Sequence, residues 1–164
     1  FLFSGTIGLN RSFMLEKENG CLMGLMLVPA DRTAIYFGKL ISNFVFLSIM
    51  ELFILPLFMI FFNIDLLGHL LPLFLVIFLG TLGFCALGTL LSSLASNLKT
   101  REIMLPILLY PLLVPIVIAV VRMTGQILAG EPLSEMMNWI GLTASFDIIY
   151  IGVSIMTIDH ILEE

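Results

Sequence analysis

The stretch LLGHLLPLFLVIFLGTLGFCALGTLLSSL, residues 66–94, decides the fold of this 164-residue chain. It contains no Asp, Glu, Lys or Arg, and it exceeds the roughly 20 apolar residues that a helix needs to cross a bilayer. In lipid the backbone polar groups must be hydrogen-bonded within the segment, so such a stretch spans the membrane as a helix. We therefore expect a transmembrane helix here.

Three other runs are also long and apolar enough to span, namely Leu40–Phe62, Ile103–Val121 and Trp139–Ile158. Hydrophobic residues make up 60% of the chain, charged residues only 12%, and the mean hydropathy is +1.14, which is too apolar for a water-soluble core. We predict an all-α integral membrane protein, a polytopic helical bundle in which residues 1–164 form a single transmembrane domain.

The first run, Phe1–Leu9, is only about half a span long, and the chain starts with Phe1 rather than with methionine. We interpret the chain as truncated at its N-terminus. If Phe1 enters from the outer side, a cytoplasmic N-terminus requires one earlier crossing. The expectation is six spans in the intact protein, of which this chain holds four and the truncated one.

Basic residues concentrate in a polar segment, Asn10–Lys39, here called the island, which carries four of the seven Lys and Arg residues. Segments 63–69, 97–102 and 122–138 carry none, two and one. Basic residues near spans stay on the cytoplasmic side. The island and the acidic tail, Asp159–Glu164, are therefore predicted to be cytoplasmic, and residues 122–138 to form an outer loop.

Several functions are disfavoured by the sequence. It has no basic patch interleaved with aromatic residues, so the expected partner is the lipid bilayer and not nucleic acid. Cys21 and Cys85 are predicted at different depths, which argues against a disulfide or a metal site. No phosphate-binding loop and no HExxH, CxxC or GxSxG motif is present. We expect no catalytic residues, no bound metal and no bound cofactor.

Small residues follow one face of the stretch 66–94 at a spacing of four. They form two neighbouring rows: Gly80, Gly88, Ser92 and Ser96, and Thr81, Cys85, Thr89 and Ser93. Small faces let membrane helices approach closely and gain dispersion contacts. This face can pack inside one subunit or form an interface with a second copy of the chain, and both readings stay open.

Three prolines, Pro106, Pro111 and Pro115, lie in the third full span. Each removes a backbone donor and bends the helix, which persists only where neighbours satisfy the freed carbonyls. The bent helix fits a moving element and a fixed irregular packing element equally well.

Two carboxylates, Glu51 and Asp147, lie near the middle of the first and last full spans. Each costs roughly 2.5 to 3.5 kcal/mol on insertion scales. The full spans contain no Lys or Arg to neutralise them, so we expect both to face the protein interior, protonated or hydrogen-bonded. A proton relay or substrate contact is one interpretation, and polar contacts that hold helices together are the other.

The island has a recognisable order of residues. It contains the charged residues Glu16, Lys17 and Glu18, followed by a predicted helix break at Asn19 and Gly20. An apolar segment that includes Leu22 comes next. The turn Pro29–Arg32 follows, in which Asp31 can cap the next helix. A cytoplasmic apolar segment flanked by charges suits either the headgroup layer or a soluble partner.

The order of these blocks resembles the haem exporter B family, CcmB. The similar residues are Arg11–Phe13, Glu16–Gly20, Leu25–Pro29 and Tyr36–Leu40, then Glu51–Leu52, Leu55–Leu57, Arg101–Glu102 with the three prolines, and Phe146–Tyr150 leading to Glu163–Glu164. The charged–glycine–apolar–proline–basic pattern is shared with other type-2 ABC exporters. The chain departs from the family at Cys21 and Met23, where Thr and Glu are common.

The resemblance implies a non-catalytic type-2 ABC exporter-like permease with six spans in the bacterial inner membrane, acting in c-type cytochrome biogenesis. It implies a cytoplasmic ATPase, CcmA, docked on the island at Glu16–Gly20, Leu22 and Arg32. It also implies the membrane partners CcmC and CcmD, the haem chaperone CcmE, and haem as cargo. ATP hydrolysis by the partner would then drive haem export or release of the haem-loaded chaperone.

Three alternatives stay open. One is the permease of another type-2 ABC exporter that carries a glycan, lipid or drug. The second is a proton-coupled secondary transporter that uses Glu51 and Asp147 and needs no ATPase. The third is a passive assembly scaffold, whose complex would form but would tolerate an inactive ATPase.

Overall fold

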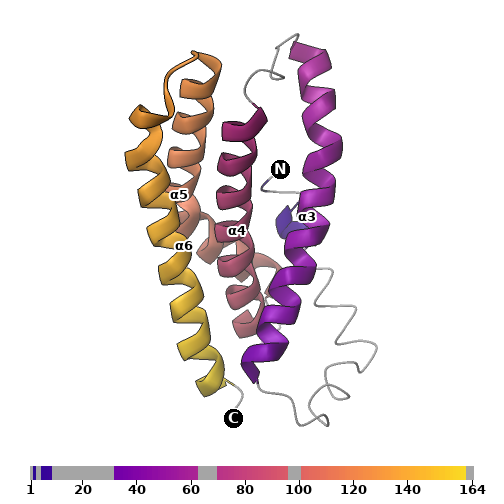
Figure 1. The fold of residues 1–164 in the computed structure, drawn as a ribbon. Coiled ribbons are helices and arrows are strands. Elements are labelled where there is room, and N and C mark those ends of the chain that lie inside the picture. The colour runs from indigo at the N-terminus through magenta and orange to yellow at the C-terminus, as the bar shows by residue number, and fades with distance from the viewer. Residues whose placement is uncertain (1, 3–4, 9–31, 63–69, 96–100, 162–164) are drawn as a thin grey trace.

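The computed structural model describes residues 2, 5–8, 32–62, 70–95 and 101–161. Four long helices account for nearly all of these residues (Figure 1). They are α3 (Arg32–Phe62), α4 (Leu70–Ala95), α5 (Arg101–Leu128) and α6 (Leu133–Ile161). All four are long and apolar enough to cross a membrane. The predicted all-α polytopic fold is thereby confirmed.

Three of the helices, α3, α5 and α6, extend beyond their apolar runs. α3 begins at Arg32, inside the island, and α5 continues to Leu128. Hydropathy marks the depth of the bilayer, whereas backbone hydrogen bonds continue through polar residues that reach the interface. Residues 122–138 are accordingly mostly helical, with only Ala129–Pro132 between α5 and α6.

The turn between α5 and α6 follows from Gly130. Its φ of 73° is left-handed, a conformation that glycine adopts without a steric penalty. The amide of Gly130 donates to the carbonyl of Ile127 (3.1 Å), and that of Glu131 to the carbonyl of Gln126 (3.0 Å). These two bonds close the end of α5 as a Schellman motif, and Pro132 then precedes the next helix.

α4 lies at the centre and packs against α3, α5 and α6 (Figure 1). Its small-residue face is largely buried within the chain, since Thr81, Cys85, Gly88, Thr89 and Ser92 are all buried. This placement favours packing inside one subunit for the residues described. Ser96 lies outside the described residues.

The first half of α3 is the half that is buried in the bundle. Its buried residues Tyr36, Leu40, Asn43 and Leu47 follow a helical spacing of three to four. In the part of α3 that the structure describes beyond Leu47, no side chain is buried. Leu55 and Met59 in this part are half-buried and pack against the core cluster that includes Leu73 and Val76. The second half of α3 is therefore more exposed than the first half but still contacts the core.

Candidate functional site

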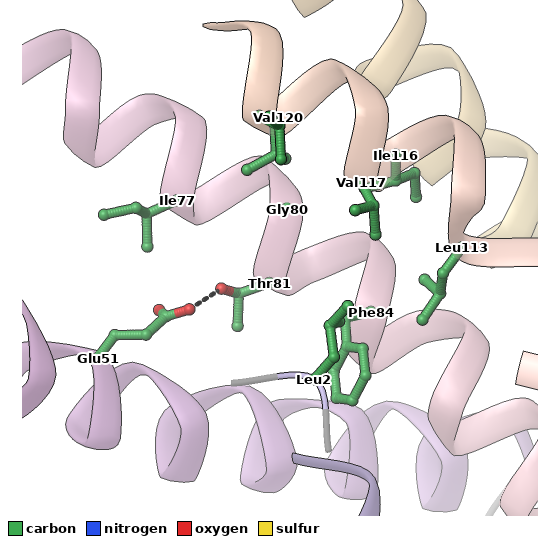
Figure 2. A pocket seen from close by; sticks show the side chains of 11 residues that line it. Leu2, Glu51, Ile77, Gly80, Thr81, Phe84, Leu113, Ile116, Val117 and Val120 are labelled. Carbon is green, nitrogen blue, oxygen red and sulfur yellow. Dashed lines mark hydrogen bonds between the residues drawn. The ribbon is translucent and has the colours of Figure 1, made fainter. Parts of the chain in front are cut away.

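A cavity of about 220 Å³ lies between α3, α4 and α5, level with Glu51 (Figure 2). Its walls come from α3, α4, α5 and Leu2. The lining residues are Leu2, Glu51, Ile77, Gly80, Thr81, Phe84, Leu113, Ile116, Val117, Val120 and Val121. Almost all of these described lining residues are apolar, and Glu51 is the only charged one among them.

Glu51 reaches across the cavity from α3 to α4. Its Oε1 accepts a hydrogen bond of 2.5 Å from the Thr81 hydroxyl (Figure 2). The Glu51 side chain is half-buried, whereas Thr81 is buried. The predicted orientation of Glu51 toward the interior agrees with this contact. Thr81, which the sequence marked only as a small residue, is its partner.

Asp147 of α6 lies in the core and is 4% exposed. It packs directly on Gly83 of α4, beside Ile116 of α5. Its Oδ1 has no hydrogen-bond partner among the described residues. Asp147 therefore lies where α4, α5 and α6 meet.

The structure does not bring the two carboxylates together. Glu51 meets α4 at Thr81 and Asp147 meets it at Gly83, and residues two apart on a helix point to nearly opposite sides. A proton path joining the two would have to cross the packed α4. Their arrangement suits two separate interhelical contacts.

Two further polar contacts, which sequence reasoning missed, fasten the first half of α3. Asn43 Nδ2 donates to Thr89 Oγ1 at 3.1 Å, and the Tyr36 hydroxyl donates to the carbonyl of Ala86 at 3.1 Å. Tyr36, Asn43 and Glu51 are spaced by seven and eight residues, so they share one helix face. This spacing could have predicted from the sequence that the three polar side chains contact the same neighbouring helix.

The proline-containing helix α5 is continuous from Arg101 to Leu128. Pro115 lacks the amide that would normally bind the carbonyl of Pro111. In the same turn, the carbonyl of Leu112 accepts a hydrogen bond of 2.5 Å from the Tyr150 hydroxyl of α6. A neighbouring helix therefore supplies a donor at the disturbed turn. Whether α5 bends at these prolines stays a prediction.

Most of the predicted docking residues, Glu16–Gly20 and Leu22, lie outside the described residues. Arg32 is described as the first residue of α3. α3 is therefore a continuous helix from the last part of the island to the membrane interior. Arg32 and Glu51 therefore lie on the same helix.

A comparison with protein families matches residues 1–163 to the family described as CcmB protein. The chain belongs to the CcmB family. Searches of curated proteins and of solved structures found no match. Membership covers essentially the whole chain, so the resemblance predicted from the ordered sequence blocks is confirmed.

CcmB membership implies the membrane component of a haem exporter ABC transporter. Together with the four apolar helices, it makes this chain a multi-pass membrane protein associated with an ABC transporter complex. CcmB proteins are permease subunits and generally non-catalytic.

Proposed function

We propose that this CcmB-family chain couples ATP hydrolysis by a separate cytoplasmic ATPase to haem export, or to release of a haem-loaded chaperone, during c-type cytochrome biogenesis. The observation that carries the proposal is the family match over residues 1–163 of a chain with four membrane-spanning helices. The complex would sit in a bacterial inner membrane, with the island and the C-terminal tail on the cytoplasmic side.

The chemistry of the cavity favours a transmitting role over a haem conduit at this place. Haem carries two propionates, which need cations, and its iron is held by His, Cys, Met or Tyr. Within the part of the chain that the structure describes, the residues that line the cavity offer none of these and include the carboxylate Glu51. Haem is therefore expected to be handled elsewhere in the complex.

The proposed transmission begins at the island. An ATPase of the CcmA type would dock at Glu16–Gly20, Leu22 and Arg32. Because α3 is continuous from Arg32, displacement of the docked island would tilt or shift α3 as one element. Glu51 lies about 28 Å along that helix from Arg32. The loose packing of the second half of α3 favours movement there over movement of α4.

The proline-containing helix α5 would carry the motion to the outer side, where Ala129–Pro132 joins it to α6. Partners of the CcmC and CcmD types would share the membrane, and a CcmE-type chaperone would receive the output on the outer side. Two copies of this chain would complete the transporter.

Affinity purification from the native host tests the proposal. The full-length tagged protein is solubilised gently, and the proteins that co-purify are identified by mass spectrometry. An ATPase together with CcmC-like and CcmD-like proteins is expected. An ATPase with glycan enzymes would move the chain to another exporter, and the absence of any ATPase would overturn the proposal.

Two variants test the docking site itself. Glu18→Lys reverses a charge, and Gly20→Pro blocks the backbone conformation at the predicted break. Both should lower ATPase recovery and c-type cytochrome yield, whereas Arg122→Gln, on the exposed end of α5, should change neither. Normal assembly and normal cytochrome production in both island variants would refute the docking assignment.

A further inference from the structure

The hydroxyl group of Tyr36 joins three helices near the island end of α3. Tyr36 is the fourth residue after Arg32, about 6 Å along the helix, and its side chain is buried. The hydroxyl donates to the carbonyl of Ala86 on α4 at 3.1 Å and makes a polar contact with the side chain of Ser154 on α6. A single phenol group therefore connects the start of α3 to both neighbouring helices.

The buried polar face of α6 leads from this contact toward the middle of the bundle. The start of α3 and the end of α6 lie at the same end of the bundle (Figure 1). The buried polar residues of α6 and Tyr150 follow a spacing of four, three and four, which places them on one helix face: Thr143, Asp147, Tyr150 and Ser154. The Ser154 hydroxyl donates to the carbonyl of Tyr150 at 2.7 Å, so the two residues also bond within their own turn.

Tyr150 carries this row of contacts to α5. Its hydroxyl donates to the carbonyl of Leu112, in the turn where Pro115 removes the amide that would bind the carbonyl of Pro111. A turn that lacks one of its own hydrogen bonds yields more easily than the rest of the helix. Tyr150 therefore acts on the main chain of α5 at its most deformable point.

We infer that Tyr36, Ser154 and Tyr150 form the contact path through which movement of α3 reaches the proline turn of α5. The inference rests on the coupling function proposed above and deepens it. When the island shifts α3, Tyr36 shifts α6 at Ser154. Because Ser154 and Tyr150 lie about one helical turn apart, Tyr150 moves with Ser154 and displaces the carbonyl of Leu112. All three are positioning residues, and the path uses no titratable carboxyl group.

Distances between pairs of spin labels in the purified full-length complex test this path. One pair, Ile41→Cys on α3 with Leu94→Cys on α4, reports movement of α3. The other pair, Leu128→Cys on α5 with Leu71→Cys on α4, reports movement of the outer end of α5. All four side chains are exposed, so the labels point away from the core. Distances are measured with and without a non-hydrolysable ATP analogue, and labelled chains are diluted with unlabelled ones so that each distance lies within one copy.

Three variants are compared in both labelled backgrounds. Ser154→Ala removes the contact of α3 with α6 and leaves the bond of Tyr36 to Ala86 in place. The ATP analogue should still shift the α3 pair as in the unsubstituted complex, whereas the shift of the α5 pair should fall to less than half. Tyr36→Phe removes the hydroxyl itself and should reduce the α5 shift in the same way. Ser145→Ala is the matched control, because its exposed hydroxyl donates to the carbonyl of Gly141 in its own helix, and it should change neither shift.

The possible results separate this path from the coupling function. An α5 shift that is unchanged in Ser154→Ala and Tyr36→Phe would overturn the path and leave the coupling function standing. Movement of α3 without movement of α5 in the unsubstituted complex would do the same. Loss of the α3 shift in Ser154→Ala would also overturn the path, since Ser154 would then only hold the bundle together. If the ATP analogue shifts neither pair in the unsubstituted complex, the coupling function is refuted and the path with it.

Discussion

The carboxyl group of Asp147 lies directly against the backbone of Gly83, where α6 meets α4. A Cβ added to Gly83 would overlap Asp147 Oδ1 and would stand 2.5 Å from Cδ1 of Ile116. Position 83 therefore admits only glycine unless neighbouring groups shift. The contact fixes the approach of three helices at the middle of the bundle.

Gly83→Ala should lower the free energy of unfolding by about 1–3 kcal/mol, the usual cost of overpacking a core. Gly141→Ala is the matched control, because a Cβ at Gly141 meets nothing within 4 Å. Unfolding of the purified full-length protein in mixed micelles, followed by far-UV circular dichroism, measures both. Equal stability of the two variants would contradict the close contact.

The same contact predicts partial rescue. Asp147→Ala removes the atom nearest to position 83, so Gly83→Ala should cost less in that background than in the wild type. The coupling between the two positions should be of the order of 0.5–3 kcal/mol, as for residues in direct contact. Strictly additive losses would show that Ile116 alone resists the added methyl group.

A positive charge at position 147 should lower the stability of the protein more than replacement of the carboxyl group by an amide. Asp147→Asn keeps the shape and polarity of the side chain, and it should change stability by less than about 1 kcal/mol. Asp147→Lys places a cation in the buried junction at a cost of roughly 2.5–3.5 kcal/mol or more. The amount of monodisperse protein after solubilisation is the measurement. A large loss with Asn would show that the carboxyl group makes an essential contact.

The double variant Glu51→Gln with Asp147→Asn distinguishes structural carboxyl groups from a proton path. Both substitutions keep hydrogen-bonding capacity and remove the titratable proton. Because the two groups meet opposite sides of α4, we expect c-type cytochrome production to be retained at near wild-type yield. If production falls while the complex still assembles, a proton path is indicated.

The spans were predictable from sequence because each is a long apolar run with a hydrogen-bonding requirement that only a helix meets. The helix ends were less so, since α3 continues into the polar island to Arg32. Glu51 and Asp147 stood out because ionisable groups are rare inside spans. The sequence therefore predicted two carboxyl groups inside the spans, but it did not predict the residues that they contact.

The partners depend on how the helices are rotated against one another. The spacing-of-four rule selected Gly80 and Gly88 on α4 but not Gly83, which makes the contact with Asp147. A single helix shows which residues share a face, but the neighbour that each face meets is set by tertiary packing. The cavity could likewise not be predicted from the sequence, because its walls come from α3, α4 and α5 and depend on how these helices pack.

Tyr150→Phe should destabilise the junction of α5 and α6 by about 0.5–1.5 kcal/mol. The variant removes the hydroxyl that donates to the carbonyl of Leu112 in the turn before Pro115. Ser145→Ala is the control, because the Ser145 hydroxyl is exposed and donates to the carbonyl of Gly141 in its own helix. Micelle unfolding compares the two. An equal effect would mean that the Tyr150 bond does not support the proline turn.

The attachment of α3 can be measured through Asn43 and Thr89, whose side chains hydrogen-bond between α3 and α4. Either Asn43→Leu or Thr89→Val alone leaves a buried polar group without its partner, so the double variant should cost less than the sum of the singles. The coupling should be about 0.6 kcal/mol and at most near 1.7, the range measured for bonds between membrane helices. Thr124→Val serves as the control partner, since Thr124 bonds to the carbonyl of Val120 in its own helix and should add without coupling to Asn43→Leu. Similar coupling in both cycles would show that the Asn43–Thr89 bond does not hold α3 to the bundle.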